Sequence, residues 1–123
     1  MHWSERWLGK PYAVLGRGPD AFDCLGLFMA VQNAEFGLSL DYGLVPLGPA
    51  EEDPRARHIG AWRKVGVARQ GDAVLIRHGR GWHVGVALDN SRMLHCTEPA
   101  SVIEPYRSPK WGKRLEGVYT YVH

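Results

Sequence analysis

The stretch "DCLGLFMAVQNAEFG", residues 23–37, carries the strongest local structural signal in the chain. Asp23 is a favourable N-cap residue, and Gly37 is a favourable residue just past a helix end. Between them, large side chains recur at spacings of three and four residues, at Leu25, Phe28, Met29, Gln32 and Phe36. These features predict a helix from about residue 23 to residue 36.

Two shorter segments precede this helix. The segment "SERWLGK", residues 4–10, predicts a short helix that Ser4 caps and Gly9 ends, because Pro11 prevents its continuation. The next segment, "PYAVLGRGPDAF", residues 11–22, is rich in Gly and Pro and is predicted to be a loop.

After residue 37 the sequence changes from helical to β character. Residues 38–50 are loop-like, and "EEDPRARHIGAWRKV", residues 51–65, predicts a second helix with acids and a proline in its first turn. Short runs rich in Val, Ile and Tyr then predict strands, namely "AVLIR" (73–77), "HVGVALD" (83–89), "RMLHCT" (92–97), "SVIEPY" (101–106) and "EGVYTYV" (116–122). Helices first and strands second indicate an α+β fold, with N-terminal helices packed on a C-terminal antiparallel sheet of about five strands.

The composition is that of a globular protein. The chain has 123 residues, of which 45% are apolar and 23% charged, so we expect one domain spanning residues 1–123. A net charge of +2 with scattered cations gives weak grounds for a nucleic-acid partner, and we expect none. The sequence has no apolar run of about 18 residues, so we expect no membrane insertion. The N-terminal segment lacks the charged-then-apolar order of a secretory signal, which predicts cytoplasmic synthesis.

Cys24 has two interpretations. In the first turn of the predicted helix, its sulfur would lie near unpaired N–H groups and the positive end of the helix dipole, which favour a nucleophilic thiolate. Alternatively it is a core residue, because free cysteine is among the most buried residue types. Its position alone does not decide between them. A disulfide with Cys96 is possible but not implied.

A cysteine nucleophile needs a base, and six histidines are candidates: His2, His58, His78, His83, His95 and His123. His83 and His95 lie in predicted strands and therefore belong to rigid elements. In such a site, one imidazole takes the thiol proton and a second polar group holds it in the right tautomer.

Three stretches together resemble the NlpC/p60 family of papain-like cysteine peptidases of the bacterial cell wall: "GKPYAVLGRGPDAFDCLGL" (9–27), "GDAVLIRHGRGWHVGVAL" (71–88) and "MLHC" (93–96). In that family the cysteine after the aspartate attacks a stem-peptide amide, the histidine of His-Val-Gly is the base, and a polar residue on the next strand orients it. The resemblance assigns these roles to Cys24, His83 and His95. It also gives Tyr12, of the Pro-Tyr pair, a role in stabilising the oxyanion.

The resemblance further implies a substrate and a biological setting. The expected scissile bond is γ-D-glutamyl-diaminopimelate in a peptidoglycan stem peptide, and no cofactor or metal is expected. Leu25 stands where serine is common in cell-wall members, and "DCLGL" resembles versions encoded by phages and phage-like particles. We therefore expect a tail component that helps to penetrate the cell wall, with other tail-tip proteins as partners. The alternative is a non-enzymatic tail-tip or assembly protein that keeps the fold.

The strand periodicity places a condition on the histidine pair. A plain two-residue hairpin at Asn90 and Ser91 would put His83 and His95 on opposite faces of the sheet. An odd-length connection, or a bulge at Gly85, would return both to one face, and we predict such an irregularity.

The same alternation bears on the second cysteine. Cys96 should point away from His95 and therefore belong to the core. A zinc site built from Cys24, His83, His95 and Cys96 is disfavoured, because adjacent strand residues cannot easily share one tetrahedral metal.

Overall fold

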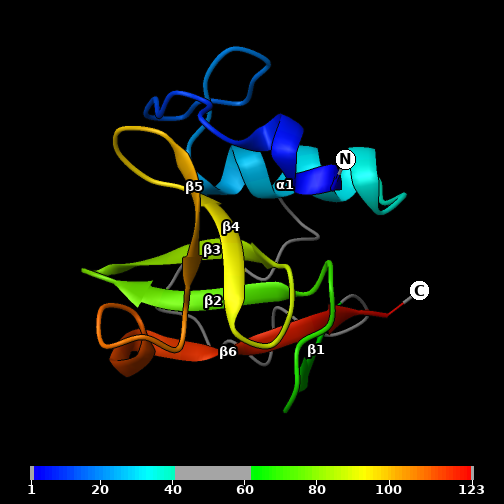
Figure 1. The fold of residues 1–123 in the computed structure, drawn as a ribbon, viewed down its shortest axis with the longest axis vertical. Coiled ribbons are helices and arrows are strands. Elements are labelled where there is room, and N and C mark those ends of the chain that lie inside the picture. Colours follow the sequence, from blue (N-terminus) through cyan, green and yellow to red (C-terminus); the bar gives the residue numbers. More distant parts are fainter. Residues whose placement is uncertain (1, 41–61, 123) are drawn as a thin grey trace.

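The computed structural model describes residues 2–40 and 62–122. These residues contain α1 (Cys24–Glu35), the 3-10 helices η1 (Trp3–Trp7) and η3 (Gly112–Arg114), and the strands β1 (Trp62–Val65), β2 (Ala73–His78), β3 (Gly81–Ala87), β4 (Arg92–Cys96), β5 (Ser101–Pro105) and β6 (Leu115–Tyr121). The six strands form one antiparallel sheet in the order β1-β6-β2-β3-β4-β5. Figure 1 shows η1 and α1 together on one side of this sheet. The predicted α+β architecture is confirmed, with six strands in place of about five.

Helix α1 forms where the sequence predicts it, to within one residue at each end. The Asp23 carboxylate caps the helix by accepting a hydrogen bond of 2.6 Å from the Gly26 amide. Past the last turn, Gly37 has a φ of +72°, a left-handed conformation that favours glycine. Of the helices within residues 2–40 and 62–122, none is long and apolar enough to cross a membrane.

The inner face of α1 packs on β3 and β4 and brings Cys24 against the sheet. Its fully buried side chains include Leu27, Phe28 and Val31, and Cys24 belongs to the same helical stripe. The buried face of α1 is therefore rotated from the one predicted by the spacing of large side chains. Phe28 and Gln32 are buried as that spacing implies, but Leu25 is only partly covered.

A close backbone approach ties the loop before α1 to the first turn of the helix. The Asp23 amide donates to the Gly16 carbonyl at 3.1 Å. A Cβ atom added to Gly26 would lie 2.1 Å from that same carbonyl oxygen, so only glycine fits there. The predicted loop over residues 11–22 is thereby held in a fixed position next to Cys24.

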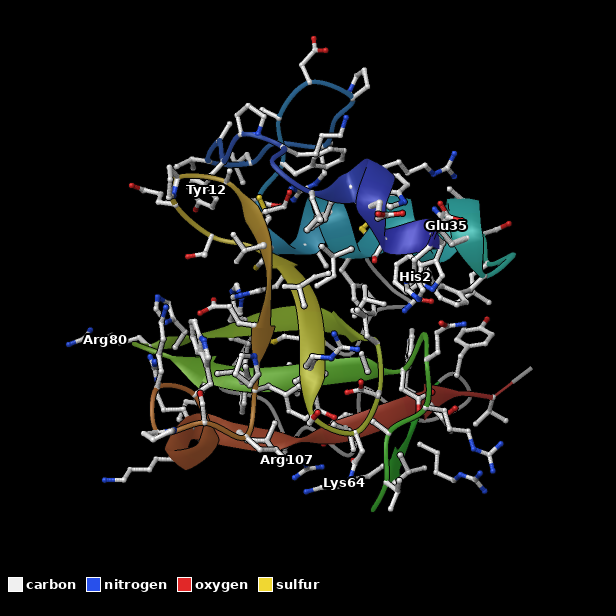
Figure 2. The ribbon with its side chains drawn as sticks, viewed as in Figure 1. His2, Tyr12, Glu35, Lys64, Arg80 and Arg107 are labelled. Atoms are coloured by element: carbon white, nitrogen blue, oxygen red, sulfur yellow. The ribbon has the colours of Figure 1, made fainter. Side chains whose placement is uncertain are left out.

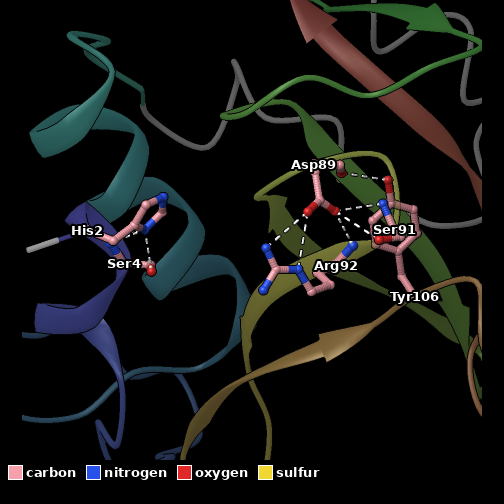
Figure 3. Close-up of polar contacts among 6 residues, drawn as sticks. All are labelled: His2, Ser4, Asp89, Ser91, Arg92 and Tyr106. Atoms are coloured by element: carbon pink, nitrogen blue, oxygen red, sulfur yellow. Dashed lines mark hydrogen bonds and ion pairs between the residues drawn. The ribbon is translucent and has the colours of Figure 1, made fainter.

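The predicted short helix near the N-terminus begins earlier than expected. It forms as η1, and His2 rather than Ser4 caps it: the His2 ring Nδ1 accepts from the Ser4 amide at 3.2 Å (Figure 3). The Glu5 carboxylate in turn accepts from the His2 amide at 2.9 Å. Ser4 is instead buried inside the first turn.

The predicted helix over residues 51–65 is wrong for its last four residues, and its first part lies outside the described residues. Trp62 to Val65 form β1, which pairs with β6. Trp62 is 2% exposed and packs against Phe28 and Tyr121. Burial of this large ring between α1 and β6 is a long-range effect that overrides the local helical pattern.

The connection between β3 and β4 has an odd number of residues. Leu88 still pairs with Arg92, which leaves the three residues 89–91 in the turn. The Asp89 carboxylate accepts hydrogen bonds from the Ser91 and Arg92 amides at 2.9 and 2.8 Å (Figure 3). These bonds lower the pKa of Asp89 to about 2. The predicted irregularity is confirmed in its odd-length form.

No bulge occurs at Gly85 within the β2–β3 ladder, whose register is unbroken from Ala73 to His78. Gly85 instead leaves space for the neighbouring strand. A Cβ atom there would lie 2.9 Å from Met93 Sδ and 3.2 Å from His95 Cβ.

The sheet buries apolar residues on both faces. The face toward α1 includes Leu75, Val84 and Leu94. The opposite face carries a second cluster, in which Trp111 and Tyr106, from the chain after β5, cover Ile76 and Met93. The strand alternation places His83 on this second face.

Candidate active site

His83 and His95 lie on the same face of the sheet and contact each other directly. His83 Nε2 and His95 Nδ1 are 2.6 Å apart, and the two rings meet edge to face at 4.8 Å. Both residues are buried, with 7% and 1% of their surface exposed. The structure thus brings together the two histidines that the sequence singled out.

The row of polar groups continues beyond His95 to the surface. His95 Nε2 lies 2.7 Å from Glu104 Oε2, and Lys110 Nζ lies 3.1 Å from Glu104 Oε1. Sequence reasoning missed Glu104. The available signal was a single acid inside the otherwise apolar run "SVIEPY", which forms β5.

Trp111 covers the histidine pair and was also missed. Its ring stacks on His83 with an interplanar angle of 9° and a centroid separation of 5.5 Å, and it meets His95 edge-on at 5.4 Å. The Arg114 guanidinium lies 4.7 Å from the Trp111 ring centroid. The basic segment around Trp111 therefore encloses part of the site.

Both imidazoles are held in the neutral form. Burial lowers the pKa of His83 to about 3, and the positive charge of Arg114 acts in the same direction. Burial also lowers the pKa of His95, although the hydrogen bond to Glu104 and its negative charge oppose this shift. At neutral pH, His83 is therefore unprotonated, and one of its ring nitrogens carries a lone pair.

Cys24 lies in the first turn of α1 and is half-buried. Burial raises the pKa of its thiol, against the opposing effect of hydrogen bonds from the Val84 and Leu25 backbone. The expectation that the helix start favours a resting thiolate is therefore wrong: desolvation outweighs the helix N-terminus. The resting group is a thiol beside neutral imidazoles.

A cleft of about 410 Å³ contains the thiol, the first imidazole and the predicted tyrosine together. It is lined by Tyr12, Cys24, His78, Trp82, His83, Cys96, Thr97 and Glu98. Among the described residues, His95 stands behind His83 rather than on the wall of this cleft. A substrate in the cleft would meet Cys24 and His83 directly.

Tyr12 reaches this cleft from the loop before α1 (Figure 2). Backbone pairing holds the loop in place, since the Tyr12 amide donates to the Pro99 carbonyl at 3.0 Å and the Phe22 amide donates to the Pro11 carbonyl at 3.0 Å. Burial raises the pKa of Tyr12, and the negative charge of Asp23 acts in the same direction, so the phenol stays protonated and can donate.

Cys96 is a core residue, as its strand position predicts. It is fully buried, and its thiol donates to the Phe22 carbonyl at 3.3 Å. Burial raises its pKa to about 11. Both cysteines are free, so the disulfide that the sequence left open does not form in this structure.

Comparisons with known proteins agree with this fold. Residues 9–120 match the NlpC/P60 family. Over 115 residues, which cover 93% of the chain, the sequence is 30% identical to that of a probable endopeptidase p60 of Listeria grayi. The chain spans only 20% of that relative's length.

Solved structures share the fold at lower identity. A Staphylococcus aureus protein, described as similar to a lipoprotein of the NLP/P60 family, superposes with a TM-score of 0.72 at 22% identity, over 96% of this chain and 38% of that one. The NlpC/p60 domain of the peptidoglycan hydrolase SagA gives a TM-score of 0.66 at 19% identity, over 95% of this chain and 92% of that one. With the α-helix on a six-stranded antiparallel sheet and the matched residues spanning nearly the whole sequence, the chain belongs to the NlpC/P60 family.

Proposed function

We propose that this chain is a cysteine endopeptidase that cleaves peptidoglycan stem peptides. The observation that carries this proposal is the shared cleft of Cys24 and His83, with His95 2.6 Å behind His83. Membership of the NlpC/P60 family supports it, as does similarity to a probable endopeptidase and to a peptidoglycan hydrolase. We propose the γ-D-glutamyl-diaminopimelate bond as the bond that is cut.

The first half of the reaction forms a thioester. Because the resting pair is a thiol and a neutral imidazole, the thiol proton moves to His83 as the Cys24 sulfur attacks the amide carbonyl. The carbonyl oxygen becomes an oxyanion, which the phenol of Tyr12 and the N–H groups at the start of α1 stabilise. The C–N bond then breaks, His83 returns its proton to the amine, and the amine leaves.

The second half of the reaction restores the enzyme. His83 takes a proton from water as the water oxygen attacks the thioester carbonyl; the C–S bond then breaks, His83 returns the proton to the Cys24 sulfur, and the carboxylic acid leaves. His95 orients His83 through both steps. Since His83 Nε2 faces His95, Nδ1 is the ring nitrogen left to exchange the proton.

The biological setting is a separate part of the proposal. We propose that residues 1–123 act as one catalytic domain, made in the cytoplasm and incorporated into a phage-like tail that meets the cell wall. The support is the "DCLGL" sequence, in which Leu25 follows the cysteine. Recovery of the protein in purified tail particles would test this part.

The deciding experiment is incubation of the purified protein with peptidoglycan or a stem peptide, followed by mass analysis of the products. Cys24→Ala should abolish cleavage. Cys96→Ala is the matched control and should retain it, because the thiol of Cys96, although it borders the cleft, is fully buried and donates to the Phe22 carbonyl. Cleavage that survives Cys24→Ala would refute the nucleophile. Absence of cleavage by the folded wild-type protein would favour a structural role instead.

A further inference from the structure

A continuous row of four side chains runs from the cleft to the surface. His83 lines the cleft, His95 is 2.6 Å behind it, Glu104 is 2.7 Å beyond His95, and Lys110 is 3.1 Å from Glu104. The side chain of His95 is fully buried, whereas that of Glu104 is 22% exposed and that of Lys110 is 60% exposed. The buried pair is therefore connected to an ionic pair at the surface.

Two neutral imidazoles in contact can share their protons in two ways. In the first arrangement, His83 Nε2–H donates to His95 Nδ1, and His83 Nδ1 carries a lone pair. In the second, His95 Nδ1–H donates to His83 Nε2, and His83 Nδ1 carries the proton. Only the first arrangement leaves His83 able to take a proton from Cys24.

The carboxylate of Glu104 distinguishes the two arrangements. An ionised carboxylate can only accept hydrogen bonds, so it requires a proton on His95 Nε2. A neutral His95 with its proton on Nε2 has a lone pair on Nδ1, and it therefore accepts from His83. The second arrangement would place two acceptors 2.7 Å apart, at His95 Nε2 and Glu104 Oε2.

The surroundings maintain the charge that this selection needs. Hydrogen bonds from His95 and Lys110 lower the pKa of Glu104 below its usual value, against the effect of burial. Trp111 covers the two rings and limits the access of water, so the hydrogen bond between His83 and His95 acts in a medium of low dielectric constant.

We propose that Glu104 is a positioning residue: acting through His95, it sets the tautomer of His83 and so makes Nδ1 of His83 the basic atom. This inference rests on the proposed roles of Cys24 and His83. It assigns to β5 a part in the reaction, although no atom of Glu104 need touch the substrate.

The informative substitution is Glu104→Gln. Glutamine has nearly the same shape and still forms a hydrogen bond with His95, but its amide can donate as well as accept. It would therefore satisfy both proton arrangements and select neither, whereas a purely structural anchor would be preserved.

Glu116→Gln is a matched control. Glu116 is 19% exposed and lies 3.5 Å from Lys64, a pair much like that of Glu104 and Lys110, but it is on β6 and outside the cleft. The substitution Glu116→Gln therefore removes one negative charge, as Glu104→Gln does, from a comparably exposed ion pair.

Two readouts test the proposal. The first is the ¹⁵N chemical shift of the His83 and His95 ring nitrogens at neutral pH, which reports where each proton resides. In the wild-type protein and in Glu116→Gln, we expect protons on Nε2 of both rings. In Glu104→Gln, we expect the His83 Nδ1 signal to move toward the protonated range.

The second readout is kcat on a stem peptide. We expect Glu104→Gln to lose at least about tenfold in kcat with an unchanged melting temperature, since an unfavourable tautomer of the base is costly in comparable hydrolases. A proton on His83 Nδ1 in the wild-type protein would overturn the proposal. So would unchanged tautomers in Glu104→Gln, whatever happens to kcat. If the wild-type protein cleaves nothing, the proposed function fails, but the nitrogen shifts still decide the role of Glu104.

Discussion

The buried base should make the stability of this protein depend on pH in a range where most carboxylates do not titrate. The perturbation is a change from pH 7 to pH 5. The pKa of His83 is about 3 in the folded protein, against about 6.5 for an exposed histidine in the unfolded chain. Between these values the unfolded state binds more protons than the native state, so stability falls as the pH falls.

The size of the effect follows from the two pKa values. Integrating the difference in proton binding from pH 7 to pH 5 gives a loss of about 2 kcal/mol in the free energy of unfolding from His83 alone. The lowered pKa of His95 acts in the same direction. The lowered pKa values of Asp89 and Glu104 contribute mainly below pH 5, because ordinary carboxyl groups remain largely ionised above it.

Urea unfolding at the two pH values measures the effect. The variant His83→Gln has no imidazole at this position, so its pH dependence should be smaller by about 2 kcal/mol, whatever its absolute stability. The quantity compared is the change in the free energy of unfolding between pH 7 and pH 5, so a variant that is less stable at both pH values still gives a valid comparison. Equal pH dependence in the two proteins would show that His83 is not held neutral by burial.

Three further substitutions test the geometry of the site. Gly85→Ala should cost about 1–3 kcal/mol in urea unfolding and reduce stem-peptide cleavage, because the new Cβ lies 3.2 Å from the hydrogen-bonded His95; unaltered cleavage would contradict this. Gly26→Ala gains about 1 kcal/mol of helix propensity. Its Cβ would nevertheless lie 2.1 Å from the Gly16 carbonyl oxygen, so net destabilisation is expected and a raised melting temperature would refute the close approach. Tyr12→Phe should lower kcat about a hundredfold with KM unchanged if the phenol stabilises the oxyanion, whereas an unchanged kcat would remove it from that role.

The parts of the fold that the sequence predicts best are those with local causes. Helix α1 has its N-cap at Asp23 and its terminating glycine at Gly37, both adjacent in sequence to the residues they affect. The face shared by His83 and His95 also has a local cause, because the parity of the β3–β4 connection fixes it. A requirement on two strand residues was thus enough to predict an irregularity, either an odd-length connection or a bulge at Gly85, and the odd-length connection is the form that occurs.

The parts that were missed depend on distant contacts. Trp62 lies in a strand because it packs on Phe28 and Tyr121, and neither contact is visible in the helical pattern around it. Glu104 reaches His95 only when β5 pairs with β4, and Trp111 reaches the histidines only when the segment after β5 folds over the sheet. The predicted lowering of the Cys24 pKa was wrong for the same reason: burial raises this pKa, and burial is a property of the whole fold.

The environment of Cys96 has a practical consequence for counting functional molecules. Both cysteines border the cleft, but Cys96 has no exposed surface and its thiol donates to the Phe22 carbonyl, whereas Cys24 is partly exposed. A thiol-reactive reagent should therefore label one cysteine per native molecule and two per unfolded molecule. The ratio of the two labelling stoichiometries would serve as a titration of correctly folded sites in any preparation, before a substrate is in hand.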